Sequence, residues 1–270
     1  MDQVTQKEIA LPSGYRMPVI GLGTWQLTGH QAEQIVAQAL DVGYRHIDTA
    51  ENYGNEEAIG RAIRGADRNA LFITSKVDPS HAHRKGVIEA CERTLDRLRT
   101  DYLDLYLLHW PAENIPEEET MEGMAWLIEQ RMIRSAGLSN FNVAGIRKVM
   151  SVTDVPICNN QIEYHPLRNR DDIMAFCRDH AISVTAYSPL ARGEVFKNDR
   201  LRELAAKYGK TPAQISLRWL IQMGAAVIPK AGSAEHLTAN FDLDNFELSL
   251  DDMDYIHDMN IERRLIDMHA

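Results

Sequence analysis

Four titratable side chains of different types follow short apolar segments of the chain. They are Asp48, Tyr53, Lys76 and His109. Taken singly, each has an ordinary structural explanation, such as a helix cap, a solvated charge or a hydrogen-bonded core histidine. If the segments are neighbouring strands, however, the four side chains meet at one rim of one sheet, which packing alone does not explain. Titratable groups gathered in this way suit proton transfer to a bound substrate.

Polar side chains also follow the other apolar segments, so the same rim would carry hydrogen-bonding groups beside the titratable ones. These positions are Ser139, Asn140, Gln161, Tyr187, Ser188 and Lys230. The elements that position all of these residues must bring the ends of many segments together.

Short apolar segments bounded by turn residues alternate along the chain with longer segments of helical periodicity. The predicted strands cover residues 19–25, 44–50, 70–77, 102–110, 133–140, 156–163, 182–189 and 225–231. Apolar stripes within 32–40 and 87–98 predict amphipathic helices between them. Thr211 to Gln214 have the pattern of a capping box, and Ser249 with Asp252 is a weaker helix start of the same kind. Eight such units in about 250 residues predict a (β/α)8 TIM barrel, whose chemistry is built at the carboxyl ends of its strands.

A short hairpin is expected ahead of the barrel. Residues 9–20 place Pro12-Ser13-Gly14-Tyr15 between apolar residues, and this hairpin could cap the barrel bottom. A doubly wound fold is disfavoured, because Gly21-Leu22-Gly23 begins a dinucleotide fingerprint whose third glycine is missing at Gln26. Since no linker or low-complexity run divides the chain, we expect residues 1–270 to form one domain.

Composition restricts the partners and the compartment. With 29 basic and 39 acidic side chains the net charge is −10, which argues against nucleic-acid binding. No segment approaches the roughly 20 apolar residues of a membrane span, and the first ten residues lack a signal-peptide pattern, so we expect a cytoplasmic protein. We also expect a monomer. Cys91, Cys158 and Cys177 are expected to be reduced and packed. His81-x-His83 lacks a third ligand, so no metal is predicted.

Motifs over nearly the whole chain resemble those of the aldo-keto reductase superfamily, especially prokaryotic members such as 2,5-diketo-D-gluconate and methylglyoxal reductases. The motifs are GLGTW (21–25), IDTAENYGNE (47–56), ITSKV (73–77), DYLDLYLLHWP (101–111), GLSNF (137–141), NNQIEYHP (159–166), AYSPL (186–190) and IPKA with the helix that follows it (228–240). The resemblance implies a barrel that binds a nicotinamide cofactor without a Rossmann domain and reduces aldehydes and ketones to alcohols. It also implies a catalytic tetrad of Asp48, Tyr53, Lys76 and His109.

The residue types suit that chemistry. Hydride delivered to a carbonyl carbon leaves a developing alkoxide, for which Tyr53 is the natural acid. A free phenol titrates near about pH 10, and one lysine charge about 4 Å away supplies roughly the 4 kcal/mol that would bring its pKa to about 7. We therefore expect Lys76 to lower the pKa of Tyr53 and Asp48 to hold the lysine ammonium in place. His109, as a neutral imidazole, would orient the substrate oxygen, and a share of the proton transfer for His109 stays open beside Tyr53.

The resemblance also implies the cofactor contacts. Ser139, Asn140 and Gln161 would bind the nicotinamide carboxamide, and Tyr187 would stack on the ring. Ser188 and Leu190 would lie along the diphosphate, Lys230 at the ribose 2′-phosphate and Asn240 at the adenine. The other implied cofactor-binding residues are Thr24, Trp25, Asp48, Ser233 and His236.

The phosphate end departs from the commonest family pattern. Ala231 stands where a Ser or Thr usually follows the lysine, and His236 stands in place of an arginine. Because histidine is mostly uncharged near neutral pH, its hold on a 2′-phosphate is weaker than that of arginine. We expect NADP(H) to be preferred, with use of NAD(H) as well.

The substrate is expected to be a small carbonyl compound. Trp25, Tyr53, His109 and Trp110 would form an aromatic wall. The chain stops soon after residues 263–267, so an open pocket is expected, suited to reactive aldehydes, 2-oxoaldehydes such as methylglyoxal, or keto-sugar acids.

Two other functions compete with carbonyl reduction. A nicotinamide-binding regulatory or sensor subunit on the same scaffold would not need the intact tetrad. An isomerase or aldolase acting through Lys76 or Lys230 would leave Asp48 and Tyr53 unexplained.

Overall fold

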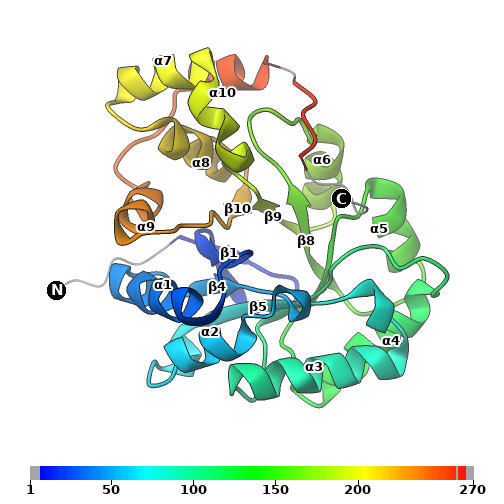
Figure 1. Cartoon of the computed structure of the whole chain (residues 1–270). Helices are drawn as coiled ribbons and strands as arrows, with labels where there is room; N and C mark the ends of the chain where they lie inside the picture. Colours follow the sequence, from blue (N-terminus) through cyan, green and yellow to red (C-terminus); the bar gives the residue numbers. More distant parts are fainter. Residues whose placement is uncertain (1–6, 260, 266–270) are drawn as a thin grey trace.

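A sheet of eight parallel strands curls into a barrel surrounded by helices (Figure 1). The computed structural model describes residues 7–259 and 261–265. The strands follow one another around the barrel in chain order: β3 (Gly21–Gly23), β4 (His46–Asp48), β5 (Phe72–Val77), β6 (Leu105–Leu108), β7 (Ala136–Ser139), β8 (Ile157–Glu163), β9 (Ser183–Tyr187) and β10 (Ala225–Val227).

The two ends of this sheet meet, so the barrel is nearly closed. Ile20 forms a parallel bridge with Val227, and the amide of Val227 donates to the carbonyl of Val19 at 2.8 Å. The predicted (β/α)8 barrel is confirmed. Each observed strand lies inside its predicted segment and is shorter.

Helices lie on the outside of the barrel. They are α1 (Gly29–Val42), α2 (Glu56–Ala62), α3 (Arg84–Leu98), α4 (Glu117–Glu129), α5 (Val143–Met150), α6 (Asp171–Asp179), α7 (Asp199–Tyr208), α8 (Pro212–Gln222), α9 (Ala234–Phe241) and α10 (Leu250–His257). Helices α1 to α8 lie between consecutive strands, and α9 and α10 follow β10. The 3-10 segments of the described chain are η1 (Glu51–Tyr53), η2 (Arg68–Ala70), η3 (Pro79–His81) and η4 (Ala191–Lys197).

The predicted hairpin is present and lies at the amino ends of the strands. Strands β1 (Glu8–Ala10) and β2 (Arg16–Pro18) pair antiparallel. From this hairpin, Leu11 and Met17 pack with residues from inside the barrel, among them Leu105 at the start of β6. The hairpin therefore covers the end of the barrel opposite the predicted site.

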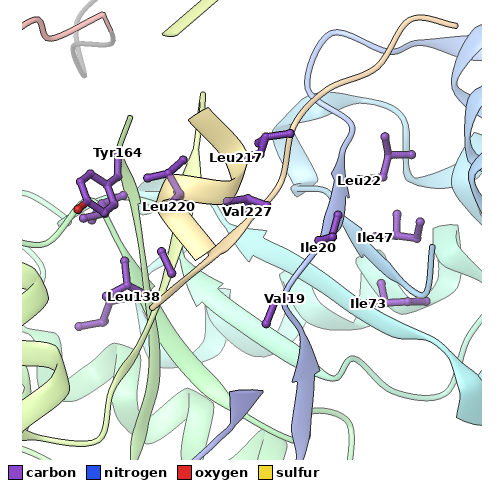
Figure 2. Packing of buried hydrophobic residues seen from close by; sticks show 14 of the residues in the cluster. Val19, Ile20, Leu22, Ile47, Ile73, Leu138, Tyr164, Leu217, Leu220 and Val227 are labelled. Carbon is purple, nitrogen blue, oxygen red and sulfur yellow. The ribbon is translucent and has the colours of Figure 1, made fainter. Parts of the chain in front are cut away.

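The main core lies between the barrel and its helices (Figure 2). The predicted helical stripes face it: Ala32, Ile35, Val36 and Ala39 of α1 are buried, as are Val87, Cys91, Leu95 and Leu98 of α3. Leu40 and Ile88, from the same stripes, are only partly buried. The three cysteines are free and buried, as predicted.

Side-chain caps fix the starts of two late helices. Thr211 and Gln214 form the predicted capping box of α8, with Gln214 N donating to Thr211 Oγ1 at 3.2 Å. Ser249 caps α10 by accepting from the amide of Asp252 at 3.2 Å. Both predicted helix starts are confirmed.

Within residues 7–259 and 261–265, no helix combines the length and apolarity that crossing a bilayer requires. The expectations about a leader and a short tail fall partly on residues 1–6 and 266–270, which lie outside the described residues.

Candidate active site

A cavity of about 670 Å³ opens at the carboxyl ends of the barrel strands. Thirteen of the predicted site residues line it: Thr24, Trp25, Asp48, Tyr53, His109, Trp110, Ser139, Asn140, Gln161, Tyr187, Ser188, Leu190 and Lys230. The strand ends therefore converge as the parallel sheet predicted.

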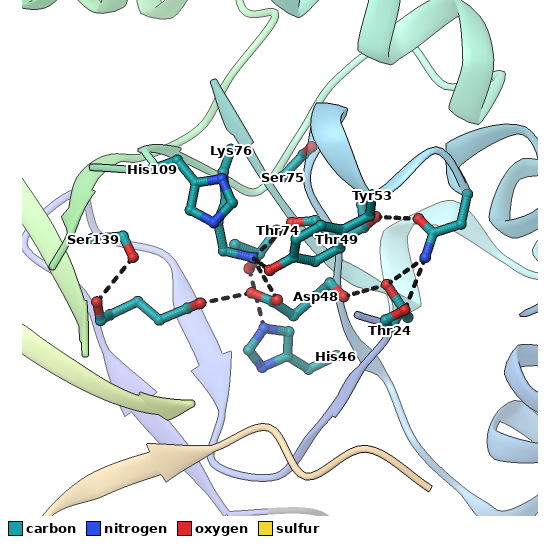
Figure 3. A network of polar contacts seen from close by, with 12 residues as sticks. Thr24, His46, Asp48, Thr49, Tyr53, Thr74, Ser75, Lys76, His109 and Ser139 are labelled. Atoms are coloured by element: carbon teal, nitrogen blue, oxygen red, sulfur yellow. Dashed lines mark hydrogen bonds and ion pairs between the residues drawn. The ribbon is translucent and has the colours of Figure 1, made fainter. Parts of the chain in front are cut away.

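Beside this cavity lies a buried ion pair between Lys76 and Asp48 (Figure 3). Lys76 Nζ donates to Asp48 Oδ1 at 2.6 Å and to the carbonyl of Thr49 at 2.8 Å. The hydroxyl of Tyr53 lies 3.4 Å from the same Nζ. Gln161 Nε2 donates to the second oxygen of Asp48 at 2.7 Å. The lysine charge is thus held between a carboxylate and a phenol.

Strand β4 and the turn after it bring Asp48 and Tyr53 together. The hydroxyl of Thr24 donates to the carbonyl of Asp48 at 2.8 Å, which ties the end of β4 to the loop after β3. The side-chain amide of Asn55 donates to the carbonyl of Thr24 at 2.9 Å, and Asn55 Oδ1 accepts from Thr49 at 2.7 Å. This network anchors both ends of η1, the segment that carries Tyr53.

The charges in the cluster shift two pKa values. Burial alone would lower the pKa of Lys76, but Asp48 and Tyr53 raise it above its ordinary value, so the lysine is charged at neutral pH. Burial raises the pKa of the Tyr53 phenol, and Lys76 opposes that rise without overcoming it. The expectation that Lys76 brings this pKa down to about 7 is therefore wrong for the protein alone. The lysine acts in the expected direction, but desolvation of the phenolate is the larger effect.

His109 is a neutral imidazole in this site. Burial, followed by the charge of Lys76, lowers the pKa of His109 to about 3. Its ring meets that of Tyr53 edge-on, with 5.8 Å between centroids. Among the described residues, His109 Nδ1 is buried without a hydrogen-bond partner. A buried N–H without an acceptor is costlier than an unused lone pair, so the ring proton is favoured on Nε2.

A second polar group adjoins the tetrad. Asn140 has a left-handed backbone with a φ of 67°. Its side-chain nitrogen donates to the carbonyl of His109 at 3.0 Å and to Ser139 Oγ at 3.1 Å. Its side-chain oxygen accepts from the hydroxyl of Tyr187 at 2.7 Å. This bond fixes the half-buried Tyr187 ring at the wall of the cavity.

Two contacts cross the mouth of the cavity. The Arg192 guanidinium lies over the Trp25 ring, 5.0 Å from its centroid. Lys230 Nζ donates to Gln26 Oε1 at 3.3 Å. The loop after β3 is therefore linked to the segments after β9 and β10.

Four predicted residues are outside the lining of this cavity, as far as the described residues show. Lys76 lies behind it. The other three, Ser233, His236 and Asn240, belong to α9 and its cap. Ser233 caps the helix and accepts from the amide of His236. His236 is exposed, and Asn240 is buried.

Asn52 and Arg192 line the cavity without having been predicted. Arg192 and Gly193 both have a left-handed backbone. The sequence signal for Arg192 was the glycine directly after it, a turn residue shortly after a predicted strand.

The two histidines of the His81-x-His83 motif have different partners. His81 lies 3.1 Å from Glu51, and His83 lies 2.8 Å from Glu119. Within the described ranges, no group of three His, Cys, Asp or Glu residues could hold a metal ion.

Known proteins are similar to this chain in both sequence and architecture. A family model described as the aldo/keto reductase family matches residues 19–261. An aldo-keto reductase from Mycobacterium avium (strain 104) is 42% identical over 260 residues, covering 95% of this chain and 92% of that protein. The crystal structure of an aldo/keto reductase from Brucella melitensis has a TM-score of 0.91 at 37% identity, covering 95% of this chain and 100% of that one.

The crystal structure of a Bombyx mori aldo-keto reductase in complex with NADP is also similar. Its TM-score is 0.93 at 34% identity, and the match covers 98% of this chain and 96% of that one. From the family model and the relatives together, the chain belongs to the aldo/keto reductase family of oxidoreductases.

Proposed function

We propose that this chain reduces aldehydes and ketones to alcohols with NADPH, using Tyr53 as the proton donor. The observation that carries the proposal is the contact of the Tyr53 hydroxyl with the buried Lys76–Asp48 pair at the wall of the cavity. Membership in the aldo/keto reductase family and the NADP-bound Bombyx mori structure support the same reaction class.

The cavity residues suit a nicotinamide cofactor. Ser139 and Asn140 present hydroxyl and amide groups, while Gln161 Oε1 can accept from a carboxamide. Tyr187 offers a ring fixed in place by Asn140. Lys230, exposed at the other end of the lining, can hold a phosphate. When bound, reduced nicotinamide supplies the hydride that goes to the carbonyl carbon.

The chain's own residues then handle the oxygen. His109, with its proton on Nε2, donates a hydrogen bond that orients the substrate carbonyl. Tyr53 gives its phenolic proton to the oxygen as negative charge develops there. Lys76 stabilises the resulting phenolate, and Asp48 keeps the ammonium in place. Solvent returns the proton to Tyr53 after the alcohol leaves.

The lining favours a small carbonyl substrate. Trp25, Tyr53, His109 and Trp110 all line the cavity, and Trp25 is 40% exposed at its mouth. Reactive aldehydes and 2-oxoaldehydes such as methylglyoxal fit this aromatic wall.

The test follows cofactor absorbance with purified protein, NADPH and methylglyoxal. Tyr53→Phe should nearly abolish turnover while NADPH binding is retained. Tyr15→Phe, an exposed tyrosine on the hairpin at the opposite end of the barrel, serves as the matched control and should turn over like the wild type.

Tight NADPH binding without turnover on a panel of reactive aldehydes would refute the proposal and favour the regulatory or sensor function. Full activity in Tyr53→Phe would refute the role of Tyr53 alone.

A further inference from the structure

The carboxylate of Glu51 links two parts of the candidate active site. Glu51 is the first residue of η1, the segment whose last residue is Tyr53. Its side chain is only 7% exposed. One oxygen, Oε1, accepts a hydrogen bond from the backbone amide of Asp78. His81 Nδ1 lies 3.1 Å from the same oxygen, and Arg93 lies 3.9 Å from Oε2.

The partner segment is the end of β5 and the residue after it. Lys76 lies two residues before Asp78, so the Glu51 bond reaches the backbone beside the lysine. The amide of His109 donates to the carbonyl of Val77 at 3.0 Å, in the same segment. The backbone at residues 76–78 therefore carries one tetrad residue and supports a second, and Glu51 joins it to the segment that carries a third.

We propose that Glu51 is a positioning residue that holds Tyr53 at its working distance from Lys76 and His109. This inference rests on the proposed function, because it assigns Tyr53 the reacting proton. The roles given to the four tetrad residues do not by themselves require a carboxylate at residue 51.

The network of Thr49 and Asn55 anchors the residues on either side of η1 through neutral hydrogen bonds. The restraints on Tyr53 itself are weaker than the Glu51 contact. Its bond to Lys76 is long, at 3.4 Å, and its amide donates only to Ala50 within the same turn. Gly54 follows Tyr53 with a left-handed φ of 65°. Because glycine has no side chain, it restricts the backbone beside Tyr53 less than any other residue would. Asn52 reaches Asp78 at 3.5 Å from an exposed position. A buried carboxylate that accepts from an amide is the stronger tie, because charge-assisted hydrogen bonds are stronger than neutral ones.

The first test compares Glu51→Ala with Glu51→Gln. Glutamine keeps an oxygen that can accept from the amide of Asp78, whereas alanine does not. A misplacement of about 1 Å can cost up to about 100-fold in rate, so Glu51→Ala should lower kcat by about 10- to 100-fold. The dissociation constant of NADPH should stay within about twofold of the wild-type value, because the carboxylate acts on the reacting groups and not on binding. Glu51→Gln should recover most of kcat.

A second pair of variants removes the donor and leaves Glu51 intact. Asp78 has a φ of −66°, which proline also adopts, and proline has no N–H to donate. Asp78→Ala removes the side chain but keeps the amide, so it is the matched control. Asp78→Pro should lose kcat as Glu51→Ala does, and Asp78→Ala should lose much less. This pair decides the question if Glu51→Ala does not fold.

Crystal structures of Glu51→Ala and Glu51→Gln separate this inference from the proposed function, because they need no turnover. The hydroxyl of Tyr53 should leave hydrogen-bond distance of Lys76 in the alanine variant and stay within it in the glutamine variant. An unmoved Tyr53, or equal kcat values in Asp78→Pro and Asp78→Ala, would overturn the inference. An inactive wild type with a displaced Tyr53 in the alanine variant would overturn the proposed function and leave the positioning role standing.

Discussion

Gln161 donates a hydrogen bond of 2.7 Å to the carboxylate of Asp48, a residue 113 positions earlier in the chain. The other oxygen of that carboxylate binds Lys76. Both oxygens of Asp48 are therefore used by side chains from other strands, and the charge of the buried lysine is held by a carboxylate that is itself fixed. One N–H of the Gln161 amide is used in this bond, so its oxygen and its second N–H are left to face a ligand.

Removing Asp48 should destabilise the protein strongly. Asp48→Ala leaves the buried Lys76 without its counter-charge, and breaking a buried pair in this way costs about 3–5 kcal/mol. The double variant Asp48→Ala/Lys76→Met removes both charges and should recover much of that loss. The free energy of unfolding of both variants is measured by urea denaturation.

The exposed pair of Glu33 with Arg61 gives the control. Glu33→Ala should cost less than about 1 kcal/mol, because exposed ion pairs contribute little. If the single and double variants at the buried pair were equally unstable, the lysine charge would not be what Asp48 compensates.

The convergence of Asp48, Lys76 and His109 was predictable because each of them lies at the end of a strand. In a parallel barrel every strand ends at the same rim, so apolar segments followed by Asp48, Lys76 and His109 were enough to bring these residues together. Tyr53 needed the additional motif after Asp48, since it lies on a 3-10 turn that has no hydrophobic period.

The rest of the site depends on turns and contacts across the barrel. Arg192 reaches the cavity through a left-handed turn, which no periodicity signals. The sign of the pKa shift at Tyr53 depends on how deeply the phenol is buried, and a charge–charge distance alone does not give it. The bond between Gln161 and Asp48 joins strands that are not neighbours in the sheet, so sequence order gives no hint of it.

The direction of the Tyr53 shift predicts the pH dependence of reduction. Burial raises the pKa of Tyr53 above its ordinary value of about 10, so the phenol keeps its proton through the neutral range. Its proton-donating form is lost only as the pH rises through that raised pKa. The kcat/KM for carbonyl reduction, measured from pH 6 upward in buffers of constant ionic strength, should therefore show no loss due to Tyr53 below about pH 10.

A fall in kcat/KM with a midpoint near neutral pH would contradict this prediction. It would mean that Lys76, or a bound ligand, outweighs the burial of the phenol.

His109 should make the protein less stable in mild acid. Its pKa is about 3 in the folded protein and about 6.5 in the unfolded chain, so between these values only the unfolded chain takes up the proton. The contribution of His109 to stability is complete above about pH 6.5 and is lost as the pH falls toward about 3. His109→Gln, which cannot titrate, should reduce the slope of unfolding free energy between about pH 6 and pH 4 by up to about 1.4 kcal/mol per pH unit.

Parallel slopes for the wild type and His109→Gln would show that the pKa of His109 is the same in the folded protein and in the unfolded chain. In that case burial and Lys76 would not lower the pKa of His109, and they would not be what keeps the imidazole neutral.

The choice between NADPH and NADH should depend on Lys230 and on the position of His236. Lys230 is an exposed cation that lines the cavity, and His236 is exposed on the first turn of α9. Because a bond to a charged group contributes about 1.5–3 kcal/mol, Lys230→Met should raise the KM for NADPH by about tenfold or more and leave that for NADH nearly unchanged. His236→Arg should shift the preference further toward NADPH, since arginine binds phosphate through two parallel bonds and keeps its charge. Lys85→Met, which removes a cation whose side chain is 87% exposed on α3, controls for the loss of net charge and should change neither KM. Equal losses for both cofactors in Lys230→Met would place the lysine on a part that NADPH and NADH share, and the 2′-phosphate would then need another partner.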